Sequence, residues 1–212
     1  MVRKKAAAGP LLDSQVLRSR RHLPKKAHVS VDSTGWDARY ASRYFLKRSG
    51  KRTQCHSHWI KSTFVCEHQT HLILAFVQGR GPGNDAAFFI PAIRQARQRH
   101  AFHSLSADAA YDVEAFHALC REQLGARRTA IPVNRRNQSL HYVPSTRYRR
   151  EMTHNFPRKI YRQRNHAECV MSECKRRIRP CLNARSSLLR NWEAQIKTLT
   201  FNALILADLK LQ

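Results

Sequence analysis

Two aspartates of this 212-residue chain each stand directly after a short stretch with the pattern of a β-strand. Asp32 closes HVSVD at residues 28–32, and Asp108 follows FHSLSA at residues 102–107. Short alternating or apolar stretches of this kind predict strands, and an α/β sheet usually gathers its functional site at neighbouring strand ends. Each aspartate could instead simply form a turn with the polar residues after it. Their equivalent positions favour a shared chemical role.

A third carboxylate, Glu168, lies in IYRQRNHAECVMSECKRRI at residues 160–178, where the spacing predicts one helix. At about 100° per residue, Glu168 shares an arc of about 60° with Tyr161, Arg164 and Lys175. An adjacent apolar stripe could pack on the sheet, and it consists of Ile160, Ala167, Met171, Cys174 and Ile178. The alternative is a solvated face on which Arg164 and Glu168 form an i,i+4 ion pair worth about a few tenths of a kcal/mol.

If this helix packs on the sheet, its carboxylate can meet the two strand-end aspartates. Asp32, Asp108 and Glu168 would then converge on one site. Oxygen ligands of this kind suit Mg²⁺, which usually keeps waters and substrate phosphates among its other ligands. The three residues therefore indicate phosphodiester chemistry.

The helix also carries a specific pattern, Y-x₂-R-x₃-E-x₆-K from Tyr161 to Lys175. This spacing resembles the Y-R-E-K signature of bacterial DDE transposases of the IS-four type. Three further segments are similar to the first-aspartate, post-hairpin and second-aspartate motifs of that family, and they occur in the family's order. They are VDSTGW at residues 31–36, GPGND at residues 81–85 and SADAAYD at residues 106–112.

The resemblance covers about residues 28 to 206 and implies a ribonuclease H-like fold. It implies that Asp32, Asp108 and Glu168 bind Mg²⁺ or Mn²⁺, as two ions, during DNA cleavage at element ends and strand transfer into target DNA. It further implies that Tyr161, Arg164 and Lys175 contact DNA phosphates, and that the protein forms a homodimer when assembled on DNA. These roles are expectations from the family.

Three other aspartates are easily confused with this triad, namely Asp37, Asp85 and Asp112. Asp85 follows Asn84 at a predicted helix start, where capping is the simplest explanation. Asp112 is predicted to cap the next helix, which ends at Gly125. We therefore leave all three out of the triad.

The remaining elements predict an α/β fold, a mixed sheet flanked by helices. After the first strand come a hairpin (59–66 and 71–77), a helix (84–99), a strand (102–107), a helix from residue 112, a strand (128–133) and the patterned helix (160–178). Residues 134–157 are polar and contain two prolines, which predicts an insertion or long loop. A C-terminal helix is predicted to pack through Leu189, Trp192, Ile196, Leu199, Ala203 and Leu206.

The net charge of the chain indicates the kind of molecule that it binds. Lys and Arg number 39 against 14 Asp and Glu, for a net charge of +25. Such a charge repels itself unless a polyanion is near, and the spread of basic residues favours double-stranded DNA over a membrane surface. Residues 1–27 are expected to form a basic flexible arm with at best a short helix near 11–18, before a catalytic domain at residues 28–212. The sequence has no apolar stretch long enough for a signal peptide or a membrane span, which predicts a cytoplasmic protein without a membrane partner.

Six cysteines show no C-x-x-C pair, so free thiols are expected. A cluster of candidate zinc ligands comprises Cys55, His56, His58, Cys66, His68 and His71. Its spacing fits no common structural zinc pattern, which favours ordinary strand and loop residues over a metal site.

Two alternatives to a transposase remain at this stage. One is a ribonuclease H-like nuclease that uses the same triad and cuts DNA without joining strands. The other is a catalytically silent, N-terminally truncated transposase remnant that binds DNA, which would account for the mere 31 residues before Asp32.

Overall fold

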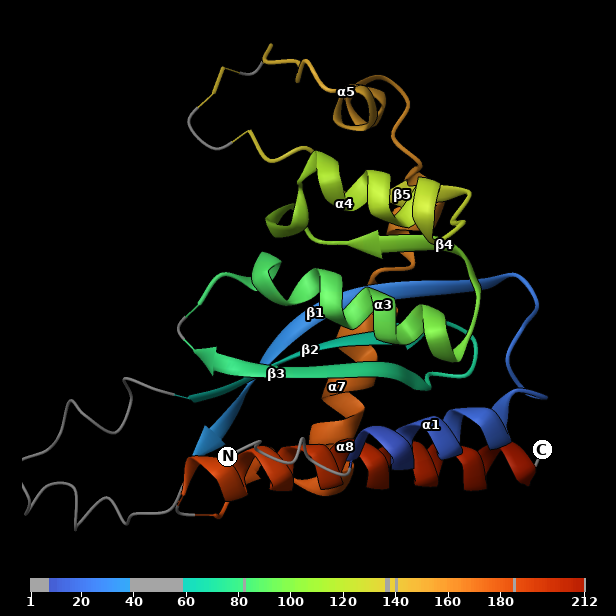
Figure 1. Cartoon of the computed structure of the whole chain (residues 1–212), viewed down its shortest axis with the longest axis vertical. Helices are drawn as coiled ribbons and strands as arrows, with labels where there is room; N and C mark the ends of the chain where they lie inside the picture. The colour runs from blue at the N-terminus through green and yellow to red at the C-terminus, as the bar shows by residue number, and fades with distance from the viewer. Residues whose placement is uncertain are drawn as a thin grey trace, which may run out of the picture.

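The computed structural model describes residues 8–38, 59–81, 83–135, 138–139, 141–184 and 186–211. Figure 1 shows how its helices surround one central sheet. In chain order the elements are α1 (Ala8–Ser19), β1 (Ala27–Ala38), β2 (Trp59–Glu67), β3 (Ile73–Gly81), the 3-10 turn η2 (Asp85–Phe88), α3 (Phe89–Arg99), β4 (Phe102–Ala107), the 3-10 turn η3 (Ala109–Tyr111), α4 (Glu114–Ala118), the π-helical turn η4 (Leu119–Gln123), β5 (Arg128–Ala130), α5 (Arg147–His154), α6 (Arg158–Arg162), α7 (Asn165–Ile178), β6 (Cys181–Leu182) and α8 (Ser187–Lys210). Among the described residues, no helix is long and apolar enough to cross a membrane.

The sheet is mixed, as the sequence predicted. Its strand order is β3-β2-β1-β4-β5, and the short β6 pairs separately with β1. The predicted hairpin is confirmed, because β1, β2 and β3 are antiparallel neighbours. The strands β4 and β5 then continue the sheet in parallel with β1. The strand predicted to end at Asp32 instead continues to Ala38, so Asp32 lies within β1, whereas Asp108 directly follows the end of β4. β1 and β4 lie side by side and point the same way.

The two faces of β1 meet different helices because successive strand side chains alternate. Val29 and Val31 are fully buried on one face. Ser30 and Asp32 point to the opposite face, where Asp32 meets Arg164 at the start of α7. In Figure 1, α3 lies in front of the sheet and α7 behind it. The polar face of β1 is thus the face that α7 covers.

Two glycines lie inside β3, although GRGPG was predicted to be a loop. The strand continues through Gly79 and Gly81. A Cβ at residue 79 would overlap the ring of Phe88, and a Cβ at residue 81 would overlap the ring of Trp59. These glycines are therefore needed for close packing of aromatic rings on the strand rather than for a turn.

The patterned segment 160–178 forms two helices instead of the one predicted. α6 ends at Arg162, and α7 begins at Asn165. Between them the N–H groups of Gln163 and Arg164 donate to carbonyls three residues earlier, at 3.1 and 2.9 Å. Such tighter bonds interrupt the α-helical ladder. The helix axis therefore breaks just before the part that carries Glu168.

The apolar stripe predicted for this segment is confirmed within α7. Ala167 and Cys174 are fully buried, and Met171 is 5% exposed. These side chains pack α7 against β1 and β2. The break before α7 therefore leaves its packing face intact and brings Glu168 close to the strand that carries Asp32.

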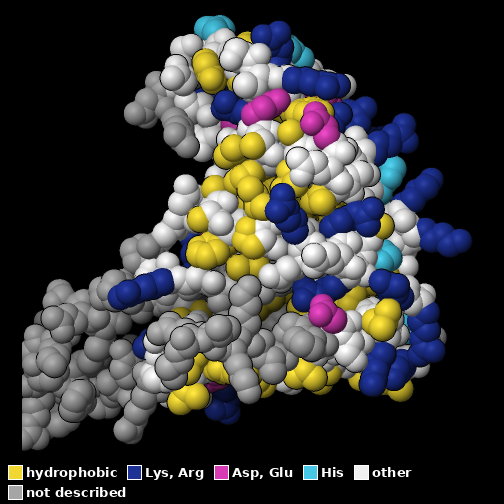
Figure 2. Space-filling model, viewed as in Figure 1, with side chains coloured by type: hydrophobic (Ala, Val, Ile, Leu, Met, Phe, Trp, Pro, Cys, Tyr) yellow, Lys and Arg dark blue, Asp and Glu magenta, His cyan; other side chains and the backbone are white. Residues whose placement is uncertain are grey.

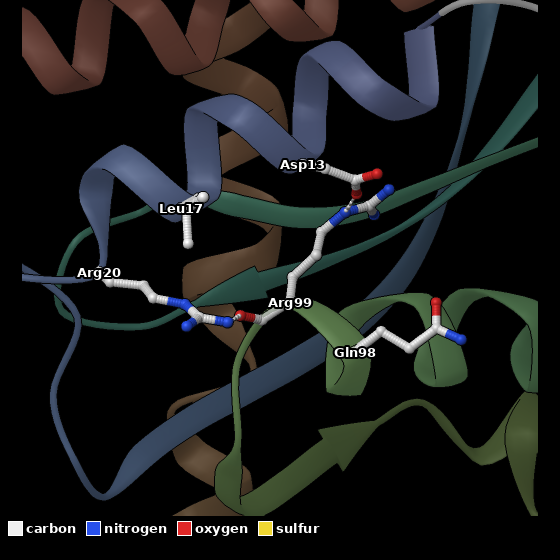
Figure 3. Close-up of a pocket in the computed structure, with 5 residues that line it drawn as sticks. All are labelled: Asp13, Leu17, Arg20, Gln98 and Arg99. Carbon is white, nitrogen blue, oxygen red and sulfur yellow. Dashed lines mark hydrogen bonds and ion pairs between the residues drawn. The ribbon is translucent and has the colours of Figure 1, made fainter.

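The N-terminal segment contains the short helix allowed near residues 11–18, but this helix spans residues 8–19 and is docked on the domain, so the expected flexibility is wrong there. Within α1, Val16 is 1% exposed and Gln15 Nε2 donates to Leu199 O on α8 at 3.0 Å. Arg99, at the end of α3, donates to Asp13 Oδ1 at 2.6 Å, and Arg20 donates to Arg99 O at 3.4 Å. Figure 3 shows the side chains of Asp13 and Arg20 pointing toward Arg99. Long-range contacts of this kind leave no periodic signal in a short basic segment.

The C-terminal packing helix is present, and Leu199 and Leu206 of the predicted stripe pack against the core, but the fully buried face is shifted from the one predicted. Leu189 and Ile196, from the predicted stripe, are 57% and 56% exposed. The buried face consists of Ala194, Thr198, Phe201, Asn202 and Ile205. Asn202 is buried because its side chain accepts from Ile73 N at 3.0 Å and donates to Ile73 O at 2.9 Å. Two polar residues therefore lie where hydrophobicity alone would not put them.

Residues 134–157 contain a docked helix, α5, in addition to loop. The prediction that Asp112 caps α4 is also wrong, because the N-cap is Val113 and no side chain caps it. Asp112 instead holds α5, accepting from Arg149 Nε at 2.9 Å and from Arg149 Nη2 at 2.8 Å. The Asp112 side chain is fully buried. This ion pair helps to attach α5 to the rest of the domain.

Candidate active site

Asp32 and Asp108 are neighbours across β1 and β4. The parallel register pairs Val31 with Ala107, so the next residue on each strand is one of the aspartates. Asp32 Oδ1 accepts from Ser33 N at 2.8 Å. Asp108 is exposed, and its Oδ1 accepts from Ala110 N at 3.4 Å at the start of η3. The two carboxylates therefore lie side by side, Asp32 partly buried within β1 and Asp108 open to solvent just past the end of β4.

Arg164 joins the third carboxylate to this edge. Its Nη2 donates to Glu168 Oε1 at 2.5 Å, and its Nη1 lies 3.7 Å from Asp32 Oδ2. The i,i+4 ion pair that the sequence left as an alternative does form, and the same guanidinium also reaches β1. The side chains of Asp32 and Arg164 are 24% and 22% exposed, whereas that of Glu168 is 52% exposed. A cation thus already stands between two of the three candidate ligands.

The electrostatics of Asp32 reflect this crowding. Burial raises the pKa of the Asp32 carboxyl, and the nearby charges of Glu168 and Asp108 raise that pKa further. The Ser33 N–H and the charge of Arg164 act in the opposite direction without cancelling the rise. An ionised Asp32 is therefore less favourable here than in water. A further cation beside it would stabilise the ionised form.

A hollow of about 250 Å³ opens beside these residues. It is lined by Asp32, Ser33, Thr34, Phe64, Glu168, Met171, Ser172 and Lys175. Lys175 Nζ donates to Thr34 Oγ1 at 2.6 Å and to Gly35 O at 2.9 Å. Lys175 therefore ties the second half of α7 to β1 and keeps its charge at the rim of the hollow.

Tyr161 lies at the margin of the same group, on α6. Its ring packs against Phe156, with centroids 5.1 Å apart. The guanidinium carbon of Arg164 is 6.0 Å from the centre of the Tyr161 ring. The structure therefore brings Asp32, Arg164 and Glu168 together, with Tyr161 beside them across the helix break.

The comparison with protein families decides the identity. A family model described as "Transposase DDE domain" matches residues 23–205. The chain belongs to the transposase DDE domain family. No curated protein matches the chain.

A solved structure supports the fold of this DDE domain. The chain is similar to a piggyBac transposase whose structure is described as a synaptic complex with hairpin DNA, at a TM-score of 0.50 and 9% identity. The match covers 84% of this chain and 46% of that chain, so the DDE domain spans about half the length of the protein it matches. The mixed sheet with helices on both faces is a ribonuclease H-like fold, as the resemblance implied.

The aspartates left out of the triad have other partners where their side chains are described. Asp85 pairs with Lys61, and the cap of η2 is Asn84, whose Oδ1 accepts from Ala86 N at 3.0 Å. Asp112 is engaged with Arg149. Asp37 belongs to β1, but its side chain lies outside the described part of the chain.

The cysteine and histidine cluster gives no zinc site in the described residues. Cys55, His56 and His58 lie outside the described ranges. Cys66 is a buried free thiol in β2, and burial raises the pKa of that thiol well above its ordinary value. Across the described ranges, which include Asp32, Asp108 and Glu168, no three His, Cys, Asp or Glu side chains lie close enough together to hold a metal ion without moving.

Some residues near the site went unnoticed in the sequence. Ser30 and Ser106 each precede a candidate aspartate by two residues and lie on the same strand face. Their hydroxyl oxygens are 2.6 Å apart and fully buried. The sequence signal for these buried serines is a serine two residues before each aspartate, in HVSVD and in SLSAD. His68, whose Nε2 lies 2.6 Å from Ser30 Oγ, is distant in sequence, and the sequence indicates it only as a candidate zinc ligand.

Proposed function

We propose that this DDE domain is the catalytic part of a DNA transposase, which cleaves DNA at element ends and joins the freed ends to target DNA. The observation that carries the proposal is the pairing of Asp32 and Asp108 in register on adjacent parallel strands, with Glu168 brought to Asp32 by α7. The family match supports the reaction class.

Three carboxylates are a suitable donor set for a hard divalent ion such as Mg²⁺ or Mn²⁺. Asp32, Asp108 and Glu168 would hold two such ions, whose chemistry is to activate an attacking oxygen and to stabilise the leaving oxygen of a phosphodiester. The raised pKa of Asp32 fits this role, because a carboxylate disfavoured by burial gains most from a nearby cation. Metal binding requires Arg164 to release at least one of its two carboxylates.

The cationic residues around the triad would bind and orient DNA. Arg164, once turned from the carboxylates, can hold a phosphate with its planar guanidinium, and Lys175 can do so as a point charge. Tyr161 can donate its hydroxyl to a phosphate oxygen. Cleavage and joining at two element ends would require two copies of the chain, which favours a homodimer on DNA.

Affinity for duplex DNA is expected to fall steeply with salt. Figure 2 shows Lys and Arg over much of the visible face and few acidic side chains, and the whole chain carries +25. Each phosphate neutralised by a cation releases counterions, so six or more contacts should weaken binding about a thousandfold between about 50 and 200 mM salt. Fluorescence anisotropy with a labelled duplex measures this slope. A nearly flat dependence would contradict an electrostatic DNA interface.

The function itself is tested with supercoiled plasmid and the purified protein in Mg²⁺, in Mn²⁺ and in chelator. Wild type is expected to nick DNA only with metal, whereas Glu168→Gln should lose nicking and keep DNA binding. Glu173→Gln is the matched control on the same helix, because Glu173 pairs with Arg177 at 3.5 Å and not with the triad. Equal nicking by wild type and Glu168→Gln would reject the assigned site.

The same assay separates the competing functions. Labelled element ends that become joined to the plasmid indicate a transposase. Metal-dependent nicking without any joined product would indicate a ribonuclease H-like nuclease. Binding without nicking in either metal would indicate a DNA-binding domain that does not catalyse.

A further inference from the structure

A chain of polar side chains runs beneath the candidate site, from β4 to the break between α6 and α7. Ser106 Oγ lies 2.6 Å from Ser30 Oγ, which lies 2.6 Å from His68 Nε2. On the other side of the ring, His68 Nδ1 lies 3.2 Å from Gln163 Oε1. Both serines are fully buried, and His68 is 5% exposed. The chain therefore connects both aspartate-bearing strands to the helix break.

The hydrogen bonds in this chain run in one direction. Gln163 Oε1 can only accept, so His68 Nδ1 must carry the proton that it donates. Burial lowers the pKa of His68 to about 4, so near neutral pH the ring is uncharged and its Nε2 is an acceptor. Ser30 therefore donates to His68 and accepts from Ser106. A neutral imidazole can donate to Gln163 and accept from Ser30 at the same time, which a purely donating or an apolar side chain could not do.

His68 contacts both sides of the helix break. Gln163 lies just before Arg164, and His166 lies in the first turn of α7. The rings of His68 and His166 are stacked, with centroids 5.2 Å apart and planes 18° apart. The backbone of the break is held only by short-range bonds to carbonyls three residues earlier. Its direction relative to the sheet therefore depends on side-chain contacts such as these.

We propose that His68 is a positioning residue whose imidazole holds the α6–α7 break against the sheet and so sets the approach of Arg164 and Glu168 to Asp32. The effect on DNA cleavage rests on the proposed function, whereas the effect on the helix break does not. A histidine that only filled the core would contribute to stability alone. Positioning of the helix break can be tested apart from stability because Nδ1 of the ring faces Gln163 at the break, whereas Nε2 faces Ser30 in the sheet.

Two substitutions of His68 each remove one of its two hydrogen bonds and keep the other. In His68→Asn, the amide nitrogen takes the place of Nδ1 and can still donate to Gln163 Oε1, while the bond to Ser30 is lost. In His68→Gln, the longer side chain can still accept from Ser30, while the bond to Gln163 is lost. Both variants lose the stacked ring, so both should lower the unfolding temperature by a similar amount.

Cleavage rate and amide hydrogen exchange at residues 163–167 are then measured on the full chain. We expect His68→Asn to keep the wild-type rate and exchange within about threefold. We expect His68→Gln to lower the rate and raise the exchange by about tenfold, which is the effect of one buried hydrogen bond. Gln163→Ala, a change at an exposed residue, should reproduce His68→Gln without its loss of stability. His103→Asn, in a neighbouring histidine outside the chain of bonds, should leave rate and exchange unchanged.

The proposal would be overturned if His68→Asn and His68→Gln lowered the cleavage rate and raised the amide exchange equally. It would also be overturned if these changes followed only the unfolding temperatures of the variants. Unchanged exchange in Gln163→Ala would overturn it as well. If wild type itself fails to cleave DNA, the proposed function fails, while the exchange measurements still decide whether His68 positions the break. Slower exchange at the break in wild type and His68→Asn than in His68→Gln and Gln163→Ala supports the proposal in either case.

Discussion

Replacing Asp32 by Asn is expected to remove DNA cleavage and, in the same protein, to raise the unfolding temperature measured without divalent metal. The loss of cleavage should be about a thousandfold or more, because metal ions contribute several kcal/mol to such reactions and each 1.36 kcal/mol is about tenfold. The gain in stability has a separate cause. Burial and two neighbouring carboxylates raise the pKa of Asp32 in the folded protein.

The sign of the stability effect follows from that pKa. A carboxyl whose folded-state pKa is raised binds protons more readily in the folded than in the unfolded protein. The resulting stabilisation is present at low pH and is lost as the pH rises from the unfolded value of 3.8 through the raised value. Near neutral pH the ionised Asp32 therefore destabilises the metal-free fold. The neutral amide of the Asp32→Asn variant would carry no such penalty, so the two proteins should differ most above the pKa of Asp32 and least in acid.

Asp108→Asn is the matched control for this experiment. Asp108 is exposed and forms only a long bond to Ala110 N, at 3.4 Å. Its substitution should remove cleavage just as fully while changing the unfolding temperature little. Thermal unfolding from about pH 3 to 8 and plasmid nicking in Mg²⁺ measure both effects. A lower unfolding temperature for Asp32→Asn at neutral pH would show that contacts to Arg164 and Ser33 outweigh burial.

The parts of the site that follow a local pattern could be predicted from the sequence. Asp32 and Asp108 could be singled out because each follows a short stretch with strand periodicity, which depends on only a few adjacent residues. That β1 continues past Asp32 to Ala38 was not predicted. The apolar stripe of α7 was found because Ala167, Met171 and Cys174 recur at helical spacing. Parallel pairing of β1 with β4 then brings the two aspartates together.

Contacts between distant residues account for the predictions that were wrong. The break after α6 involves Gln163 and its bond to His68, which is 95 positions away. The buried face of α8 is determined partly by Asn202, which bonds to the backbone of Ile73. In each case a buried polar side chain, His68 or Asn202, has its hydrogen-bond partner on another element. Periodicity treats such residues as solvent-facing and therefore assigns the wrong face.

Replacing Asp112 by Ala is expected to destabilise the domain by about 3 to 5 kcal/mol, as removal of one member of a buried ion pair does. The Asp112 side chain is fully buried and binds Arg149 through both guanidinium nitrogens that face it. It also accepts from Asn134 N at 2.8 Å. The substitution would leave the Arg149 guanidinium and this N–H without their acceptor and would weaken the attachment of α5, which Glu114 also holds through Tyr148 N and Arg149 N. Chemical denaturation with tryptophan fluorescence measures the loss.

Asp13→Ala gives the contrasting case, because Asp13 also pairs with an arginine, Arg99, but is 59% exposed (Figure 3). Exposed ion pairs contribute about 0 to 1 kcal/mol, since water screens the charges and replaces the lost contact. The two losses should therefore differ severalfold. In the double variant Asp112→Leu with Arg149→Met, both charges are removed, so much of the stability lost in Asp112→Ala should return. Equal losses for Asp112→Ala and Asp13→Ala would mean that the Asp112 pair does not hold α5 to the domain.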